Sequence, residues 1–148
     1  MMDPRAFLNI AGEAAAGTRE EDWRTAAGRA YYAAFLVARD LLVKAGFQVP
    51  PDQGGHAYIW LRLSNCGRTE IEEAGKTLRN LRRHRTWADY DTAHPFPEEL
   101  AVQQVNQALT FVDVLDALAE TASALATVVA NIRDNEQRVL GENTYTPP

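Results

Sequence analysis

Between its loop-forming breaks, the chain spaces apolar residues three and four positions apart, which is the repeat of a helix that packs one face on a core. Prolines and glycines mark breaks at residues 50–55 and 95–97. No stretch of useful length alternates apolar and polar residues as a half-buried strand does. The sequence therefore predicts an all-α fold, in which three or four antiparallel helices with short connections form an up-and-down bundle.

Capping residues indicate where the first two helices begin and end. Asp3 followed by a proline predicts a helix over 4–16, with Asp3 as N-cap. Thr18 begins a capping-box pattern, completed by a glutamate three residues later, and predicts a long alanine-rich helix over 18–45. Gly46 suits the position just after the end of that helix.

Two further helices are expected in the middle of the chain. A short helix is predicted over 56–67, and another over 69–87, where Thr69 and Glu72 form a second capping box. The residues that follow, 88–97, are expected to form a loop.

The segment 98–140 contains no glycine or proline and keeps a near-heptad stripe of apolar residues. At ~1.5 Å per residue an unbroken helix would be about 60 Å long, which is more than a small bundle needs. The segment is therefore either broken midway or extended past the bundle to pair with a partner helix. We favour a long C-terminal helix engaged in a homodimer, within a single domain over 1–148 whose core covers about 4–119 and whose residues 141–148 form a polar tail.

Composition excludes several functional classes. The 148 residues are 46% apolar, carry a net charge of −5 and include one cysteine, Cys66, which can form neither an intrachain disulfide nor a cysteine-rich zinc site. The N-terminus carries charges where a signal peptide needs an apolar run, and no segment is long enough to span a membrane, so we expect a cytoplasmic protein. Motifs for ATP, dinucleotide or carboxylate-bridged metal sites are absent from the sequence, and no metal or cofactor is expected.

One basic stretch stands out on this acidic chain. Residues 76–85 read KTLRNLRRHR and hold five of the 15 Lys and Arg residues, with no acid among them. Guanidinium groups bind phosphates, an imidazole titrates near neutral pH, and an aromatic ring offers a face for a base. The candidate RNA- or phosphate-binding residues are Asn80, Arg82, Arg83 and Trp87. The alternative for Arg82 and Arg83 is a solvated cationic face near a helix C-terminus.

Helix geometry separates the side chains of this stretch. With Leu78 at the centre of the buried face, four side chains are expected to point outward: Arg79, Asn80, Arg83 and His84. Arg82 lies at the edge, whereas Arg85 projects about 20° from Leu78, on the buried side. Because an unpaired buried charge is costly, Arg85 needs a partner, and Asp89 or Asp91 is the natural candidate.

Three elements, in order along the chain, resemble the HEPN domain. They are GRAYYAAFLVARDLLVKAGF (residues 28–47), a histidine after a polar loop (Gly55-His56) and RTWADYD (residues 85–91). The resemblance covers about residues 5–119 and is closest to prokaryotic members with an R-x-x-A-D-Y signature. It implies an α-helical bundle that usually dimerises and that, in many members, is encoded beside a minimal nucleotidyltransferase in toxin–antitoxin or abortive-infection modules.

Catalytic members of this family are metal-independent ribonucleases that carry R-x4-6-H, and two frames are possible here. Arg79 and His84 match the pattern as R-N-x3-H. The R-x-x-A-D-Y context instead aligns Arg85 with the family arginine and puts Asp89 and Tyr90 where the histidine would lie, which departs from the catalytic pattern. Residues five apart on a regular helix project about 140° from each other, so Arg79 and His84 share one phosphate only in a distorted helix or across a dimer.

If the site is catalytic, the 2′-OH of RNA is the nucleophile. His84 would act as general base or acid, and Arg79 with Arg83 or Arg85 would stabilise charge on the phosphorane oxygens. We therefore expect an RNA- or nucleotide-facing component of a prokaryotic toxin–antitoxin or defence module, with ribonuclease activity as one class. The alternative is a non-catalytic module that docks a nucleotidyltransferase or another protein.

Overall fold

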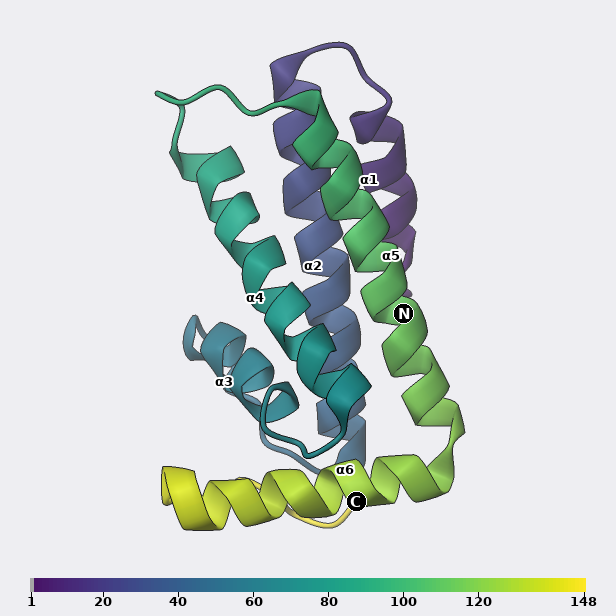
Figure 1. Ribbon diagram of the computed structural model, residues 1–148, viewed down its shortest axis with the longest axis vertical. Coiled ribbons are helices and arrows are strands. Elements are labelled where there is room, and N and C mark those ends of the chain that lie inside the picture. The colour runs from purple at the N-terminus through teal and green to yellow at the C-terminus, as the bar shows by residue number, and fades with distance from the viewer. Residues whose placement is uncertain (1) are drawn as a thin grey trace. The chain divides into compact units, whose positions relative to one another are not determined.

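The structure is a computed structural model that describes residues 2–148 (Figure 1). Its elements are α1 (Ala6–Ala15), α2 (Glu20–Ala45), α3 (Gly54–Leu63), α4 (Thr69–Tyr90), α5 (Glu98–Glu120), α6 (Ala122–Asn135) and a π-helical turn, η1 (Glu136–Leu140). Within the described residues, the only β-type pairing is a single bridge between Phe47 and Tyr145. The predicted all-α class is confirmed.

Contacts divide the chain into two compact units, each assembled from two stretches. Unit 1 comprises the chain up to Val37 together with Thr77–Val112, and unit 2 comprises Ala38–Lys76 together with Asp113–Pro148. The helices α2, α4 and α5 each contribute residues to both units. All the predicted site residues, 79–90, belong to unit 1.

The core of unit 1 forms around an alanine-rich face of α2. Five alanines of this face are completely buried: Ala26, Ala27, Ala30, Ala33 and Ala34. Leu78 and Leu81 of α4 and Phe111 of α5 are buried with them. The buried leucines leave the opposite side of α4 to its polar and cationic residues, as the helical wheel predicts.

The predicted end of α2 is confirmed, but its predicted N-terminal capping box is wrong. Gly46 has a φ of 116° and the Phe47 N–H donates to the Leu42 carbonyl at 3.0 Å, which closes the helix as expected. At the other end α2 begins at Glu20, and it is the Asp22 carboxylate that accepts the Arg19 backbone N–H, at 3.2 Å. Acidic residues at 20, 21 and 22 made the register of this cap ambiguous in the sequence.

The helix α4 continues beyond its predicted end near Trp87 and closes at Tyr90, so the predicted loop begins later, at Asp91. The guanidinium of Arg24, on α2, donates to the Ala88 carbonyl at 2.9 Å and to the Asp91 carbonyl at 2.9 Å. Carbonyls at a helix C-terminus lack intrahelical partners, so this distant arginine stabilises the additional turn. The extension carries Asp89 and Tyr90 on the same helix as Arg85.

The favoured single helix over 98–140 is wrong, and the alternative of a break midway is confirmed. Thr121 leaves the helical region, with φ −112° and ψ 90°, between α5 and α6. Its hydroxyl donates to the Ala117 carbonyl at 3.0 Å, which satisfies one acceptor at the end of α5. Beyond Thr121, α6 runs crosswise to the last turns of α5 (Figure 1). No glycine or proline marks the break.

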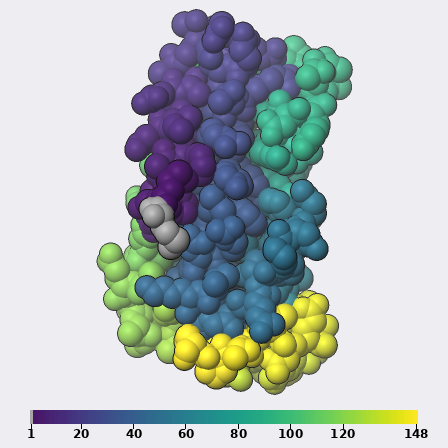
Figure 2. All heavy atoms as spheres, turned by 180° about the vertical axis from the view of Figure 1, so that it is seen from behind, coloured from purple at the N-terminus to yellow at the C-terminus, as the bar shows by residue number. Residues whose placement is uncertain are grey.

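Within unit 2, a buried ion pair and backbone hydrogen bonds hold the end of the chain in place. The side chains of Arg62 and Glu136 are 4% and 1% exposed, and Nη2 of Arg62 lies 3.0 Å from Oε2 of Glu136. The Thr144 backbone N–H donates to the same carboxylate at 3.2 Å, and the Gln48 N–H donates to the Thr144 carbonyl at 2.9 Å. Figure 2 shows the tail (yellow) lying against the segment that follows α2 (blue).

Candidate functional site

The basic stretch lies on α4, which is a regular α-helix from Thr69 to Tyr90. Arg79, Asn80 and Arg83 are exposed, as predicted, and Arg82 is half-buried at the edge of the helix face. Among residues 2–148, neither Arg82 nor Arg83 forms an ion pair with a carboxylate. Two positive charges on this face are therefore not neutralised by acidic groups of the protein.

Arg85 contacts both of the residues that follow it in the R-x-x-A-D-Y signature. Its Nε lies 2.9 Å from Oδ2 of Asp89, one helical turn away, and the two side chains are 30% and 38% exposed. Its guanidinium carbon also lies 5.4 Å from the centre of the Tyr90 ring, which is 71% exposed. The prediction that Arg85 needs a carboxylate is confirmed, and Asp89 supplies it.

The alanine-rich helix α2 lies directly against this ion pair of Arg85 and Asp89. Gly28 lies beside Asp89, because a Cβ at Gly28 would stand 3.5 Å from Oδ1 of that carboxylate. Tyr31 is buried one turn further along α2, and burial raises the pKa of its phenol, although the positive charges of Arg82 and Arg85 oppose the rise. The two arginines therefore lie within electrostatic range of the Tyr31 hydroxyl.

We use the term α4 cluster for the five residues that combine exposed or half-buried charge with an exposed ring: Arg82, Arg83, Arg85, Asp89 and Tyr90. The cluster offers guanidinium donors for phosphate oxygens, a carboxylate that can accept a proton, and an aromatic face.

Arg24 holds the end of α4 in place and was not identified from the sequence. Besides its bonds to the Ala88 and Asp91 carbonyls, it donates to the His94 carbonyl at 2.6 Å, and its side chain is 13% exposed. Glu20, one turn before Arg24, accepts the Phe96 backbone N–H at 2.6 Å. The only signal available in the sequence was a pair of opposite charges at i,i+4, Glu20 and Arg24, before the apolar residues on that side of α2.

His84 is bound to the neighbouring helix α5, contrary to the prediction that it points outward. Its Nδ1 lies 2.9 Å from Oε1 of Gln104, whose Nε2 donates to the Leu81 carbonyl at 3.1 Å. Gln104 is completely buried, so it needs both partners. Because Oε1 only accepts, Nδ1 of His84 carries a proton in this bond, and Nε2 is the nitrogen left for acid–base chemistry.

The regular helix α4 does not bring Arg79 and His84 together within one chain. The regular helix leaves them about 140° apart around its axis, and His84 is directed to α5. The distorted helix that the first frame requires is not present in α4. The second frame differs, since Arg85, Asp89 and Tyr90 are in mutual contact through Arg85.

Trp87, the candidate stacking residue of the RNA-binding set, is half-buried and packs against Phe96 in unit 1. Its ring meets the buried ring of Phe96 edge-on at 5.1 Å, and its Nε1 donates to the His94 carbonyl at 3.3 Å. His94 in turn bonds to Asp91 at 2.9 Å. Desolvation raises the pKa of Asp91, but the hydrogen bonds and charge of His94 outweigh it, so the pKa lies below its ordinary value. These hydrogen bonds therefore hold the loop after α4 against the end of that helix.

Comparison with known proteins identifies a family. The family model for the HEPN domain matches residues 10–120, which is most of the chain and includes the whole α4 cluster. No curated protein and no solved structure gives a significant match. In the part of the chain that the structure describes, no helix is both long and apolar enough to cross a lipid bilayer.

Proposed function

The chain belongs to the HEPN domain family, and from that premise we propose that it is the RNA-facing component of a prokaryotic toxin–antitoxin or defence module. Membership of the family points in general to a nuclease or an RNA-related module. In this chain we assign phosphodiester binding to the α4 cluster, acting in a homodimer, since HEPN domains often dimerise.

The observation that carries this proposal is the pair of cations without acidic partners beside an exposed ring. Arg82 and Arg83 pair with no carboxylate among residues 2–148, and Tyr90 is 71% exposed. On a chain of net charge −5, this face is a local concentration of positive charge, and phosphate is the common ligand of such a face. Tyr90 supplies the platform on which a base stacks.

The same cluster supports metal-independent cleavage of RNA. Asp89 would accept the proton of the 2′-OH as that oxygen attacks the phosphorus, and Arg85 with Arg82 would stabilise charge on the phosphorane oxygens. The P–O5′ bond would then break, leaving a 2′,3′-cyclic phosphate and a 5′-OH that takes its proton from the protonated Asp89 or from water. We place this role on Arg85 and Asp89 because they are already in contact at 2.9 Å, whereas Arg79 and His84 would have to come from two subunits.

A second function, docking of a nucleotidyltransferase or another protein without catalysis, is favoured by the same ion pair. Arg85 is held by Asp89 and His84 by Gln104, so neither the arginine nor the imidazole is free of internal bonds. A docking surface needs only the exposed members of the cluster, Arg83, Asp89 and Tyr90.

One experiment separates the two functions. Labelled RNA is incubated with the purified protein in EDTA, beside Arg85→Ala, Asp89→Asn and the Arg79→Ala/His84→Ala pair, while binding is measured by anisotropy for Arg82→Ala/Arg83→Ala. We expect the last variant to lose about tenfold in affinity at low salt and to reduce the slope of log affinity against log salt by roughly one to two. The matched control is Arg39→Ala, an exposed arginine of α2 that is paired with Asp40.

If Asp89→Asn abolishes RNA cleavage and Arg79→Ala/His84→Ala retains it, the second frame, which uses Arg85 and Asp89, is established. If RNA is bound but neither the wild type nor any variant cleaves it, the non-catalytic docking function remains. Equal RNA affinity in wild type and Arg82→Ala/Arg83→Ala would overturn the assignment of the phosphate surface to the α4 cluster.

A further inference from the structure

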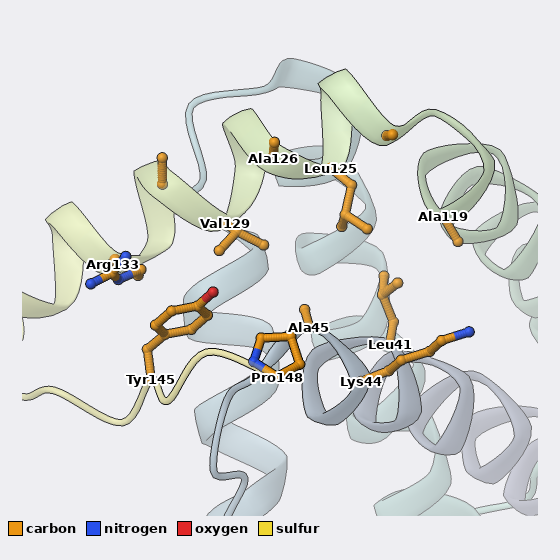
Figure 3. A pocket seen from close by; sticks show the side chains of 12 residues that line it. Leu41, Lys44, Ala45, Ala119, Leu125, Ala126, Val129, Arg133, Tyr145 and Pro148 are labelled. Atoms are coloured by element: carbon orange, nitrogen blue, oxygen red, sulfur yellow. The ribbon is translucent and has the colours of Figure 1, made fainter.

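A cavity of about 550 Å³ opens in unit 2, a region that the proposed RNA function does not use (Figure 3). It lies between the last turns of α2, the end of α5, α6 and the C-terminal tail. The side chains of Leu41, Leu125 and Val129 project into it, and alanines such as Ala126 complete the apolar lining (Figure 3). A concave site of this size, mostly apolar with a few polar groups, has the character of a small-molecule site.

The polar groups at this cavity are positively charged. Lys44 and Arg133 are part of its lining, and none of the lining side chains is acidic. Neither cation pairs with a carboxylate anywhere in the described chain. Arg133 lies over the ring of Tyr145, with its guanidinium carbon 4.3 Å from the ring centre, so the planar group is oriented by an aromatic neighbour.

Tyr145 adds a hydrogen-bond donor on the same side. Its hydroxyl points away from the tail toward Val129, into the cavity (Figure 3). That hydroxyl makes no hydrogen bond within residues 2–148. The guanidinium stacked on the Tyr145 ring and the phenol O–H at the edge of that ring are both donors to a carboxylate.

Hydrogen bonds within the protein already hold the C-terminal tail, which carries Tyr145, in place. The Thr146 N–H donates to the Gly46 carbonyl at 2.8 Å, and the Gln48 N–H donates to the Thr144 carbonyl at 2.9 Å. The rings of Phe47 and Tyr145 pack with their centres 5.2 Å apart. Because these bonds hold the tail against the end of α2, binding need not order a loose segment.

We propose that this cavity binds an amphipathic carboxylate, an aliphatic chain of medium length with one anionic headgroup. The chain lies against Leu41, Leu125 and Val129, and the carboxylate is bound by the Arg133 guanidinium and the Tyr145 hydroxyl, with Lys44 adding attraction at the rim. Charge argues against a second copy of the chain as occupant, since a twofold contact at this face would bring two sets of the same cations together.

The test uses decanoate as probe on the full chain, with binding measured by calorimetry and located by amide and alanine-methyl chemical shifts. We expect decanoate to shift the signals of residues 122–133 and to bind about tenfold more tightly than decanol, which has the same chain without the charge. Arg133→Gln should remove most of that difference and leave the affinity for decanol unchanged. Ala126→Trp, which fills the cavity, should abolish the binding of both.

Two matched variants control for unrelated effects. Arg138→Gln removes a cation of η1 that is paired with Asp134 and lies outside the cavity, and Thr127→Trp adds the same ring at the neighbouring exposed position of α6. Both should bind decanoate like the wild type. Decanoate binding that survives Ala126→Trp, or equal affinity for decanoate and decanol, would overturn the proposal. A change of association state in Ala126→Trp without any decanoate binding would assign the cavity to a protein partner instead. RNA affinity should not change in Ala126→Trp, so this test and that of the α4 cluster fail independently.

Discussion

Replacing Arg24 with alanine should unfold the last turn of α4 and destabilise unit 1. Nη1 of Arg24 lies 2.9 Å from the Ala88 and Asp91 carbonyl oxygens and 3.3 Å from that of Trp87, and Nη2 lies 2.6 Å from the His94 carbonyl oxygen. A hydrogen bond from a charged donor contributes about 1.5–3 kcal/mol, but water can reach some of these carbonyls once the side chain is gone. We therefore expect the free energy of unfolding to fall by about 3 kcal/mol, the value of one to two such bonds.

Urea denaturation measures this loss, and hydrogen exchange locates it. The Asp91 N–H bonds to the Trp87 carbonyl at 3.0 Å, so its exchange should accelerate by at least about tenfold when the turn frays. Arg39→Ala is the matched control, because Arg39 is an exposed α2 arginine bonded to Asp40, and its loss should cost less than about 0.5 kcal/mol. An Arg24→Ala protein within about 1 kcal/mol of wild type, with unchanged exchange at Asp91, would refute the view that this guanidinium sets the length of α4.

Three further predictions concern other parts of the molecule. Arg62→Ala should lower the free energy of unfolding by about 3–5 kcal/mol, since it leaves the buried Glu136 carboxylate without its cation; a urea midpoint equal to wild type would contradict this. Gly46→Ala should lower the free energy of unfolding by about 1–3 kcal/mol, because φ is 116° and the new Cβ would lie 2.5 Å from the Thr146 carbonyl oxygen. Thermal melting measures this loss, and an unaltered melting temperature would contradict the prediction. Burial raises the pKa of Tyr31, so its contribution to stability is complete below the ordinary tyrosine pKa of about 10 and is lost as pH rises above it. Urea denaturation of wild type and Tyr31→Phe at about pH 8 and about pH 11 should show a smaller alkaline loss in the variant, and identical losses would exclude this role for Tyr31.

Local patterns were sufficient to predict the helical class and the positions of most helix ends. The spacing of apolar residues assigns Leu78 and Leu81 to the core face of α4, and both are buried. The same wheel places Arg85 near that face and requires a carboxylate for it, which Asp89 provides one turn later. These inferences succeed because each depends on residues within a turn or two of one another.

Some predictions failed because a residue far away in the sequence determines the outcome, whereas those for the α2 cap and the break at Thr121 failed on local detail. α4 extends to Tyr90 because of Arg24, more than sixty residues earlier, and His84 is drawn to α5 because buried Gln104 needs a partner. The break at Thr121 involves an ordinary threonine whose hydroxyl bonds to the preceding turn, with no glycine or proline to signal it. Polar groups that satisfy one another across helices leave no periodic pattern, so only the three-dimensional arrangement reveals them.

The division of the chain into two discontinuous units determines how the protein can be dissected. A fragment that stops at Val112 retains every residue of unit 1, yet it also carries residues 38–76 without the stretch 113–148 that completes their core. Such a fragment would expose the apolar side chains Ile59 and Leu63, which are completely buried in the whole chain, and would be prone to aggregate. Isolating the half that bears the α4 cluster therefore requires excision of residues 38–76 and a short engineered bridge, because truncation from either end removes the partner of a segment that remains.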